Sequence, residues 1–280
     1  MPFLELFDET LDINSTDNYE LSVQVSPYEL SFCILDSLRN KFVLLRSYEP
    51  EDNSRFDPFR LNEIIKKDDF LIRHYKKTSV ITPSSKSTLV PSPLFDESKT
   101  NEYFTFNQAI SEGDKIMTNK LHNPDIYIIF SVSTWIEDIL KAAFPGSILM
   151  HQLKPLFQFI NYSKRSIASN HVQVHFEKDY LNMVIFDQNE LKFCNTFHYK
   201  TIPDVQYYIL YVLKKMNISQ EETIFFSGKT TKREEVLNVF SNYLRVIKYA
   251  LPPGNCNYSY VFNDTELHIF LNLFSAVSCG

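Results

Sequence analysis

The chain has 280 residues, of which 44% are hydrophobic and 22% charged, and its formal net charge is -6. This hydrophobic content excludes a disordered chain, and the length allows two domains that each bury a core. The acidic balance disfavours nucleic acid as a partner, because nucleic-acid binding needs a basic face.

The cysteines and the N-terminal residues predict a reduced protein in the cytoplasm. Cys33, Cys194, Cys256 and Cys279 are scattered without a CxxC pair, so we expect no zinc site. The sequence MPFLELFDET is acidic and is not a basic region followed by an apolar run. No stretch of about 18 consecutive apolar residues occurs, so we expect no membrane insertion.

Residues Met1 to Tyr19 are expected to be a lead-in with little structure of its own. After it, residues Leu21 to Tyr48 predict a three-stranded meander, and His171 to Tyr199 repeat its outline. In both copies a VQV triplet opens the first strand, at Val23 to Val25 and at Val172 to Val174. The alternation of apolar residues predicts strands with at least one buried face.

Helices and strands alternate after each meander. A first helix is expected from about Asp57 to His74, with Asp57 as its N-cap and Pro58 at its first position. The other expected elements of the first half are strands 78–82, 114–121, 125–133 and 147–151, and helices 96–110, 134–144 and 154–168. Those of the second half are helices 204–216, 231–244 and 264–274, and strands 222–227 and 245–250.

An insertion is expected at about 83–121 in the first half. The similar sequences IIFS at Ile128 to Ser131 and IFFS at Ile224 to Ser227 predict that these two strands are equivalent in the two repeats. The first copy is then longer between its meander and this strand. We therefore expect a first domain at 1–169, with the insertion, and a second domain at 170–280.

Each half thus reads as βββαβαβα, with an antiparallel meander and parallel crossover strands in one mixed sheet flanked by helices. Two such units resemble the duplicated ribonuclease H-like domains of the actin-like ATPase fold, an α/β class. The VxV meanders, the segment TLVPSPLF at Thr88 to Phe95 and the length resemble, more narrowly, an uncharacterised bacterial family with a degenerate actin-like fold. That family is a domain of unknown function, so the resemblance implies a fold and leaves the activity open.

In active members of the actin-like fold, the turn between the first two strands of each domain carries an Asp and a Gly that serve phosphate and metal. Here the first turn is Ser26 to Glu29, which has no Gly or Asp and contains a Pro. The second turn, His175 to Tyr180, has no Gly and carries bulky side chains. Both phosphate-binding loops are therefore expected to be lost.

The best remaining candidate for binding a nucleotide or another anion is Ser227, Gly228, Lys229 and Thr230. These residues occupy the place of the strand, turn and helix that hold the nucleotide base in such folds. A P-loop would need Gly at the position of Thr223, so that interpretation fails. The alternatives are a tight turn at Gly228 with a capping box from Thr231 and Glu234, or anion binding at the helix start.

Other catalytic interpretations lack support. Asp36 and Asp187 lie at strand ends, where we expect turn or capping roles, so two-metal nuclease chemistry is set aside. His171 and His175 would lie roughly 13 Å apart along a strand and could not share one zinc ion. The last helix, Glu266 to Val277, is expected to pack on the second sheet, with a partner or a membrane surface as alternatives.

The sequence therefore favours a non-catalytic, two-domain actin-like protein that acts by binding an unidentified protein, with no cofactor. The insertion, which only the first repeat has, is the candidate surface for that partner. The alternative is a divergent nucleotide-binding ATPase or kinase that uses the cleft between the domains.

Overall fold

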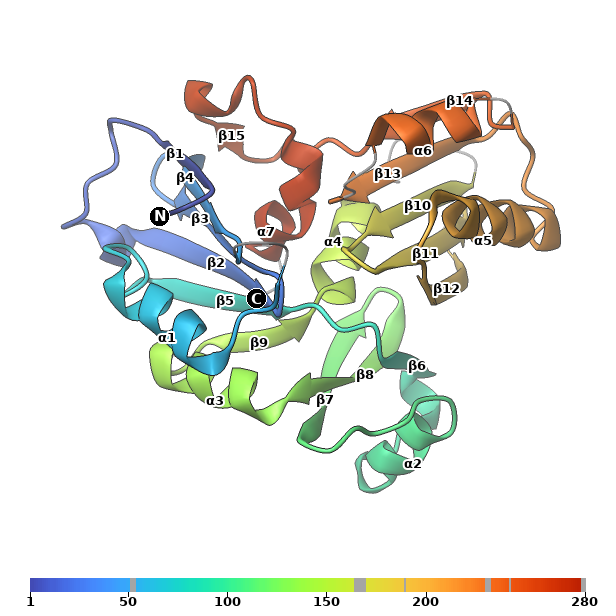
Figure 1. The fold of residues 1–280 in the computed structure, drawn as a ribbon, viewed down its shortest axis with the longest axis horizontal. Coiled ribbons are helices and arrows are strands. Elements are labelled where there is room, and N and C mark those ends of the chain that lie inside the picture. Colours follow the sequence, from blue (N-terminus) through green and yellow to red (C-terminus); the bar gives the residue numbers. More distant parts are fainter. Residues whose placement is uncertain (51–53, 164–169, 189, 230–232, 242, 278–280) are drawn as a thin grey trace. The chain divides into compact units, whose positions relative to one another are not determined.

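The computed structural model describes all residues except 51–53, 164–169, 189, 230–232, 242 and 278–280 (Figure 1). The chain divides into two units. The first contains Met1–Gln158, Pro253–Thr265 and Asn272–Gly280, and the second contains Phe159–Pro252 and Glu266–Leu271.

The first unit is built on a mixed sheet in the order β1-β4-β3-β2-β5-β9, with β15 pairing on β4. Its strands are β1 (Leu4–Phe7), β2 (Tyr19–Ser26), β3 (Glu29–Asp36), β4 (Lys41–Tyr48), β5 (Lys77–Thr82), β9 (Ile148–His151) and β15 (Asn257–Tyr258). The meander β2-β3-β4 is antiparallel, whereas β5 and β9 join it in parallel through helical crossovers. This is the predicted mixed sheet.

Helices α1 (Pro58–Lys67) and α3 (Thr134–Ala143) contact each other in the first unit (Figure 1). Helix α1 begins as predicted, because the side chain of Asp57 accepts the N–H of Arg60 and Pro58 occupies the first turn. The helix ends at Lys67, earlier than expected, since Asp68 leaves helical geometry and its carboxylate accepts the N–H groups of Phe70 and Leu71.

A separate three-stranded sheet, in the order β6-β8-β7, projects from the first unit. It contains β6 (Ser87–Pro91), β7 (Asp114–His122) and β8 (Asp125–Ser133), together with 3-10 turns η3 (Ser92–Leu94) and η4 (Glu97–Lys99) and helix α2 (Thr100–Thr105). The predicted equivalence of β8 with the strand at Ile224 to Ser227 is wrong. Among the described strands, β8 pairs with β6 and β7 of the small sheet, and β5, parallel to β2, corresponds to β13, parallel to β10.

The second unit repeats the strand arrangement of the first in the order β12-β11-β10-β13-β14. Its strands are β10 (His171–Phe176), β11 (Tyr180–Asp187), β12 (Glu190–His198), β13 (Thr223–Gly228) and β14 (Val246–Tyr249), and its helices are α5 (Ile202–Lys215), α6 (Arg233–Phe240) and the 3-10 helix η7 (Leu267–Phe270). Helix α4 (Leu153–Ser163) connects the two units in sequence. The duplicated ribonuclease H-like fold is therefore confirmed.

One face of the second sheet forms an apolar core with α5 and α6. Val172, Val174 and Phe176 of β10 point into this core, and Ile209 of α5 and Phe240 of α6 cover them. Because side chains alternate along a strand, the intervening residues of β10 face the other way. That opposite face carries the polar residues described below.

The last helix does not pack where the sequence suggested. Helix α7 (Leu271–Ala276) places the ring of Phe274 edge-on against Phe42 of β4, with centroids 4.9 Å apart, and against Tyr258 of β15. The expectation that Glu266 to Val277 covers the second sheet therefore holds for its first part, since η7 contacts β13 and His268 lies against Tyr249 of β14, and is wrong for α7. Its amphipathic sequence required a sheet to pack against but did not specify which of the two similar sheets it would be.

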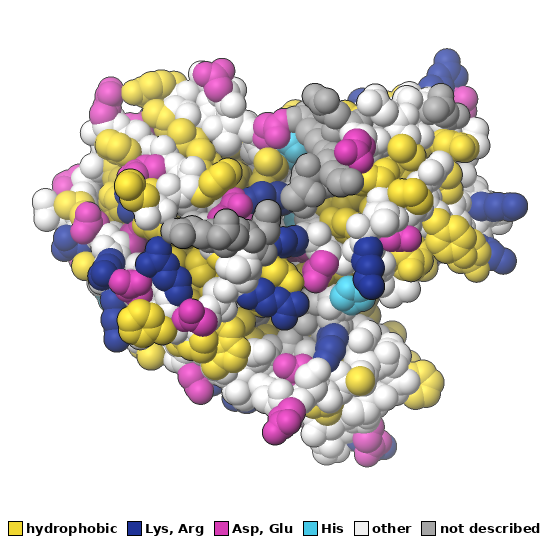
Figure 2. All heavy atoms as spheres, viewed as in Figure 1, with side chains coloured by type: hydrophobic (Ala, Val, Ile, Leu, Met, Phe, Trp, Pro, Cys, Tyr) yellow, Lys and Arg dark blue, Asp and Glu magenta, His cyan; other side chains and the backbone are white. Residues whose placement is uncertain are grey.

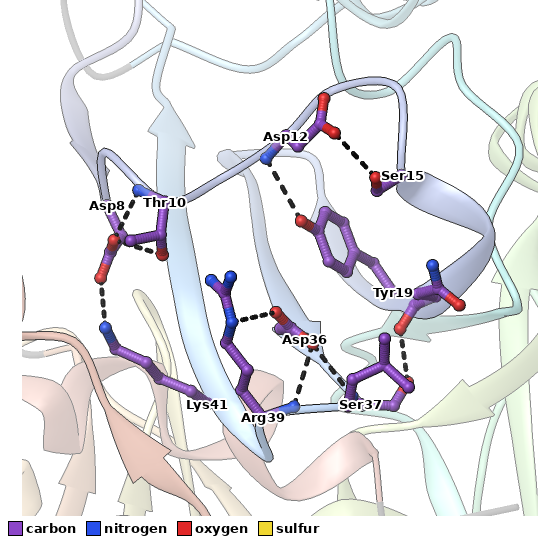
Figure 3. Close-up of polar contacts among 11 residues, drawn as sticks. Asp8, Thr10, Asp12, Ser15, Tyr19, Asp36, Ser37, Arg39 and Lys41 are labelled. Carbon is purple, nitrogen blue, oxygen red and sulfur yellow. Dashed lines mark hydrogen bonds and ion pairs between the residues drawn. The ribbon is translucent and has the colours of Figure 1, made fainter.

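The N-terminal residues are also more structured than expected. Strand β1 pairs antiparallel with β4, and the 3-10 turn η1 (Thr16–Asn18) precedes β2. Figure 3 shows Asp8 accepting a hydrogen bond from Nζ of Lys41 at 2.6 Å, and the N–H of Asp12 donating to the hydroxyl of Tyr19 at 3.2 Å. These contacts hold the segment onto the meander.

Candidate functional site

The first turn in the place of a phosphate-binding loop is a two-residue hairpin, because Ser26 and Glu29 pair across it. The N–H of Tyr28 donates to Oγ of Ser26 at 3.1 Å, and the carbonyl oxygen of Pro27 accepts the N–H of Phe56 at 2.7 Å. Pro27 has no N–H. The backbone polar groups of this turn are thus engaged by the protein itself, and Arg55 packs over the ring of Tyr28.

The second turn, between β10 and β11, is also closed by contacts within its own unit. The N–H of Glu177 donates to the carbonyl of Tyr180 at 2.8 Å, and the hydroxyl of Tyr199 donates to the carbonyl of Glu177 at 2.5 Å. Burial, together with the charges of Glu177 and Asp179, raises the pKa of Tyr199, so its hydroxyl remains a proton donor. A phosphate-binding loop needs several backbone N–H groups that point at the same anion. In this turn the N–H of Glu177 instead donates to the carbonyl of Tyr180.

Ser227, Gly228 and Lys229 lie at the end of β13, beside this second turn. Gly228 has a φ of +79°, and its backbone approaches Phe176 so closely that a Cβ would fall 2.0 Å from the carbonyl oxygen of that residue. The N–H of Lys229 donates to the same carbonyl at 3.1 Å. Gly228 therefore allows the end of β13 to lie close beside its parallel neighbour β10, and the Lys229 amide is used in that contact.

The remaining residues of this prediction lie outside the described part of the chain. Thr230 and Thr231 are not described, nor is the side chain of Glu234, so the capping box falls there too. The role of the segment in binding an anion or nucleotide stays a prediction.

Ser227 belongs to a buried polar cluster that sequence reasoning missed. Its Oγ accepts a hydrogen bond from Nε2 of Gln173 at 2.8 Å and lies 2.8 Å from Nδ1 of His175. Nε2 of His175 in turn lies 3.5 Å from a carboxylate oxygen of Glu177. The hydroxyl of Ser227 has a second lone pair and a proton, so the tautomer of His175 decides which of the two residues donates in this contact.

A hydroxyl, an imidazole and a carboxylate in this order are the groups that activate the serine nucleophile in enzymes with a catalytic triad. However, Ser227 is only 1% exposed, and His175 is 2% exposed. The hydroxyl therefore cannot reach a substrate in this conformation. The hydrogen bonds of Ser227 with Gln173 and His175 link β13 to β10, whereas Oε1 of Gln173 is buried without a hydrogen-bond partner among the described residues.

A signal for this cluster was present in the sequence. His171, Gln173 and His175 occupy every second position of β10, opposite the apolar Val172, Val174 and Phe176. Such alternation places all three polar residues on one face, where they need partners if that face is buried. The sequence excludes a shared zinc ion and favours structural or surface roles for the two histidines, and this alternation adds that their common face needs polar partners.

The strand positions of the other candidates agree with the sequence. His171 and His175 both lie on β10, and His171 stacks on Phe225 with centroids 4.9 Å apart. The described residues contain no group of three His, Cys, Asp or Glu side chains that could hold a metal ion. Asp36 has the predicted turn role, since its Oδ1 accepts the N–H groups of Leu38 and Arg39 (Figure 3).

In the part of the chain that the structure describes, no helix combines the length and apolar character needed to cross a bilayer. Two mixed sheets with the same strand order, each begun by an antiparallel meander, define a protein with the actin-like ATPase fold. The chain belongs to the family described as protein of unknown function DUF3822, whose model matches residues 8–247.

Comparison with solved structures supports this assignment of the fold. A protein from Bacteroides thetaiotaomicron, described as having an actin-like ATPase fold and unknown function, is 24% identical with a TM-score of 0.79, over 86% of this chain and 93% of that one. A chain of the PilM-PilN type IV pilus biogenesis complex is 10% identical with a TM-score of 0.59, over 93% and 98%. No curated protein matches the sequence.

Proposed function

We propose that this protein is a non-catalytic member of the actin-like fold that acts by binding another protein. The observation that carries the proposal is the state of the two hairpin turns. Pro27 removes one amide from the first turn, and the N–H groups of Tyr28 and Glu177 donate within their own turns. Turns engaged in this way offer little to the phosphates of a nucleotide. A fold can persist after its chemistry is lost.

A nucleotide-binding experiment tests the loss of the phosphate-binding loops. A nucleotide at 100 times its dissociation constant would add about 2.7 kcal/mol to the unfolding free energy. We expect no change in melting temperature with millimolar ATP or ADP and magnesium. A rise that depends on nucleotide concentration would contradict the proposal and favour the alternative, a divergent ATPase or kinase.

The small sheet is the surface that we assign to the partner. Leu94 and Phe106 are 69% and 91% exposed, although the elements that carry them are fixed by a local core. Below them, Phe95 stacks on Tyr127 with centroids 3.8 Å apart. Large exposed apolar side chains on a well-packed support are typical of protein-binding surfaces. The PilM-PilN complex provides a precedent, on the fold alone, for such a protein working in a protein assembly.

Point variants test this surface better than a deletion of 83–121, because β8 would lose both of its neighbours in the small sheet. We expect Leu94→Ser combined with Phe106→Ser to abolish partners detected by cross-linking in cells that make the protein. The control combines Leu38→Ser with Phe59→Ser, which are 77% and 78% exposed in the first unit outside the small sheet. Retention of the same partners by the first variant would exclude this surface.

A further inference from the structure

Strand β12 is an edge strand of the second unit, and among the described strands it pairs only with β11. Its nine residues end one side of the five-stranded sheet. An edge strand carries a row of outward backbone groups that can pair with another strand. Natural edge strands usually restrict such pairing with bulges and charged side chains. The part of β12 that has no bulge is therefore the part where pairing remains possible.

The first part of β12 is protected in this way, but its second part is regular. The pairing with β11 shifts between Ile185 and Phe186, so that Lys192 is an extra residue next to a bulge. From Phe193 to His198 the register then continues without interruption. The accessible part of the edge is therefore this second segment.

The hydrogen bonds identify which backbone groups of this segment face outward. The N–H of Tyr199 donates to the carbonyl of Asp179, one step beyond the pair of Tyr180 with His198. Because bonded and non-bonded pairs alternate in antiparallel ladders, residues 197, 195 and 193 also direct their backbone toward β11. The N–H of Thr196 accordingly donates not to β11 but to the side-chain Oδ1 of Asn195, at 2.9 Å.

Aromatic side chains flank this edge on the side of α5. Phe197 stacks on Tyr208 with centroids 4.8 Å apart, and Phe193 and Phe197 share this face of the strand. Tyr207 and Tyr211, 62% and 48% exposed, continue the row along the helix. Figure 2 shows hydrophobic side chains gathered over α5. The surface thus combines a strand edge with an aromatic row.

We propose that β12 pairs antiparallel with β12 of a second copy of this chain, around a twofold axis at Asn195. This register places Phe193 of each copy opposite Phe197 of the other, so that two aromatic cross-strand pairs form on the α5 side. It also brings the exposed Glu190 end of one strand to the exposed Lys200 end of the other, which are oppositely charged. The two sheets become one continuous sheet, and the two α5 helices lie on the same face.

The self-complementary sequence favours a second copy over a foreign strand. An isologous contact of this kind closes on itself, because each copy uses its only pairing segment in β12. It therefore predicts a dimer and no longer polymer. The local bond from Thr196 to Asn195 must break, and the new inter-strand bonds replace it.

The first test introduces like charges at the axis. Asn195→Lys places two ammonium groups opposite each other, although the exposed side chain of residue 195 leaves the monomer core unchanged. By sedimentation equilibrium we expect wild type to reach twice 32.9 kDa with increasing concentration, and the variant to need at least about tenfold more protein. Asn101→Lys, exposed on α2, is the control and should behave as wild type.

The second test is a cross-link at the axis. A non-bonded antiparallel pair has Cα atoms about 4.5 Å apart, within the range of about 4.4–6.8 Å for disulfides. Asn195→Cys should therefore form an intermolecular disulfide under mild oxidation, whereas Asn101→Cys should not. The proposal is overturned if wild type remains a monomer at all concentrations. It is also overturned if a dimer forms that Asn195→Lys does not weaken.

Discussion

Gly228 and Phe176 are in backbone contact, with room for no side chain between them: a Cβ at residue 228 would lie 2.0 Å from the Phe176 carbonyl oxygen. Gly228→Ala must therefore displace β13 from β10, in addition to straining a backbone with a φ of +79°. We expect a loss of about 3 kcal/mol or more in unfolding free energy, measured by urea denaturation.

Gly146→Ala separates the effect of the close approach to Phe176 from the effect of the left-handed backbone. Gly146 has a similar φ of +76°, but no atom lies within 4 Å of its Cβ position. This control should lose only about 1 kcal/mol, the cost of left-handed backbone for an L-residue. Equal losses in the two variants would show that the close approach to Phe176 contributes nothing.

Asp8 connects segments from both ends of the chain. Its carboxylate accepts hydrogen bonds from Lys41 of β4 and from Oγ of Ser259, the latter at 2.5 Å. Burial raises the pKa of Asp8, but the hydrogen bonds from Lys41, Ser259 and Thr10 outweigh it, and the net pKa is lowered. Asp8→Asn should cost about 3 kcal/mol, since it leaves the Lys41 end of the pair without its charge.

The stability contributed by Asp8 should depend on pH in a defined direction. A carboxyl group whose pKa is lowered by folding stabilises the protein above its ordinary pKa, and this contribution disappears as the pH falls through the folded value. The difference between wild type and Asp8→Asn should thus shrink in acid. Asp12→Asn is the control in the same segment: this exposed side chain accepts only local hydrogen bonds from Asn14 and Ser15, which an amide oxygen can also accept, so the variant should lose much less stability than Asp8→Asn.

His151 predicts a second pH dependence. Burial lowers the pKa of this imidazole to about 3, although a hydrogen bond to the Ser84 carbonyl partly opposes the shift. In the unfolded chain this imidazole is protonated below about pH 6.5, whereas in the folded chain it stays neutral. The unfolding free energy should therefore fall by about 3 kcal/mol as the pH decreases from 7 to 4. Urea denaturation of wild type and His151→Asn at both pH values measures this. An equal slope in the two proteins would contradict the prediction.

Asp68 is the centre of a buried network in the first unit. Its Oδ2 accepts hydrogen bonds from Arg46 at 2.7 Å and from the hydroxyl of Tyr48 at 2.6 Å. Asp68→Asn should destabilise by about 3–5 kcal/mol, because the Arg46 charge would remain buried with a weaker partner. Glu63→Gln, which weakens surface ion pairs with Arg60 and Lys67 on α1, should lower the melting temperature far less than Asp68→Asn does.

Local features of the fold could be predicted from the sequence, whereas the sheet that each strand or helix joins could not. The meanders and the Asp57 cap follow from apolar alternation and from turn and cap residues, which act over a few positions. The sequences of Ile128 to Ser131 and Ile224 to Ser227 predict a buried strand equally well. Which sheet each strand joins depends on contacts far along the chain, and the same limit applies to α7.

The candidate site shows the same limit. Gly228 could be recognised as a position that needs glycine, but its contact with Phe176 requires the register of β13 on β10. The partners of Ser227 come from β10, about 50 residues earlier in the sequence, so their pairing depends on that register too.

The position of α7 has a consequence for synthesis on the ribosome. Phe42, near the start of the chain, is covered by Tyr258 and Phe274, near its end. The first unit can therefore complete its core only after the entire second unit has left the exit tunnel. Until then the nascent chain holds an exposed aromatic surface at β4, so the second unit, although made later, is free to finish folding first.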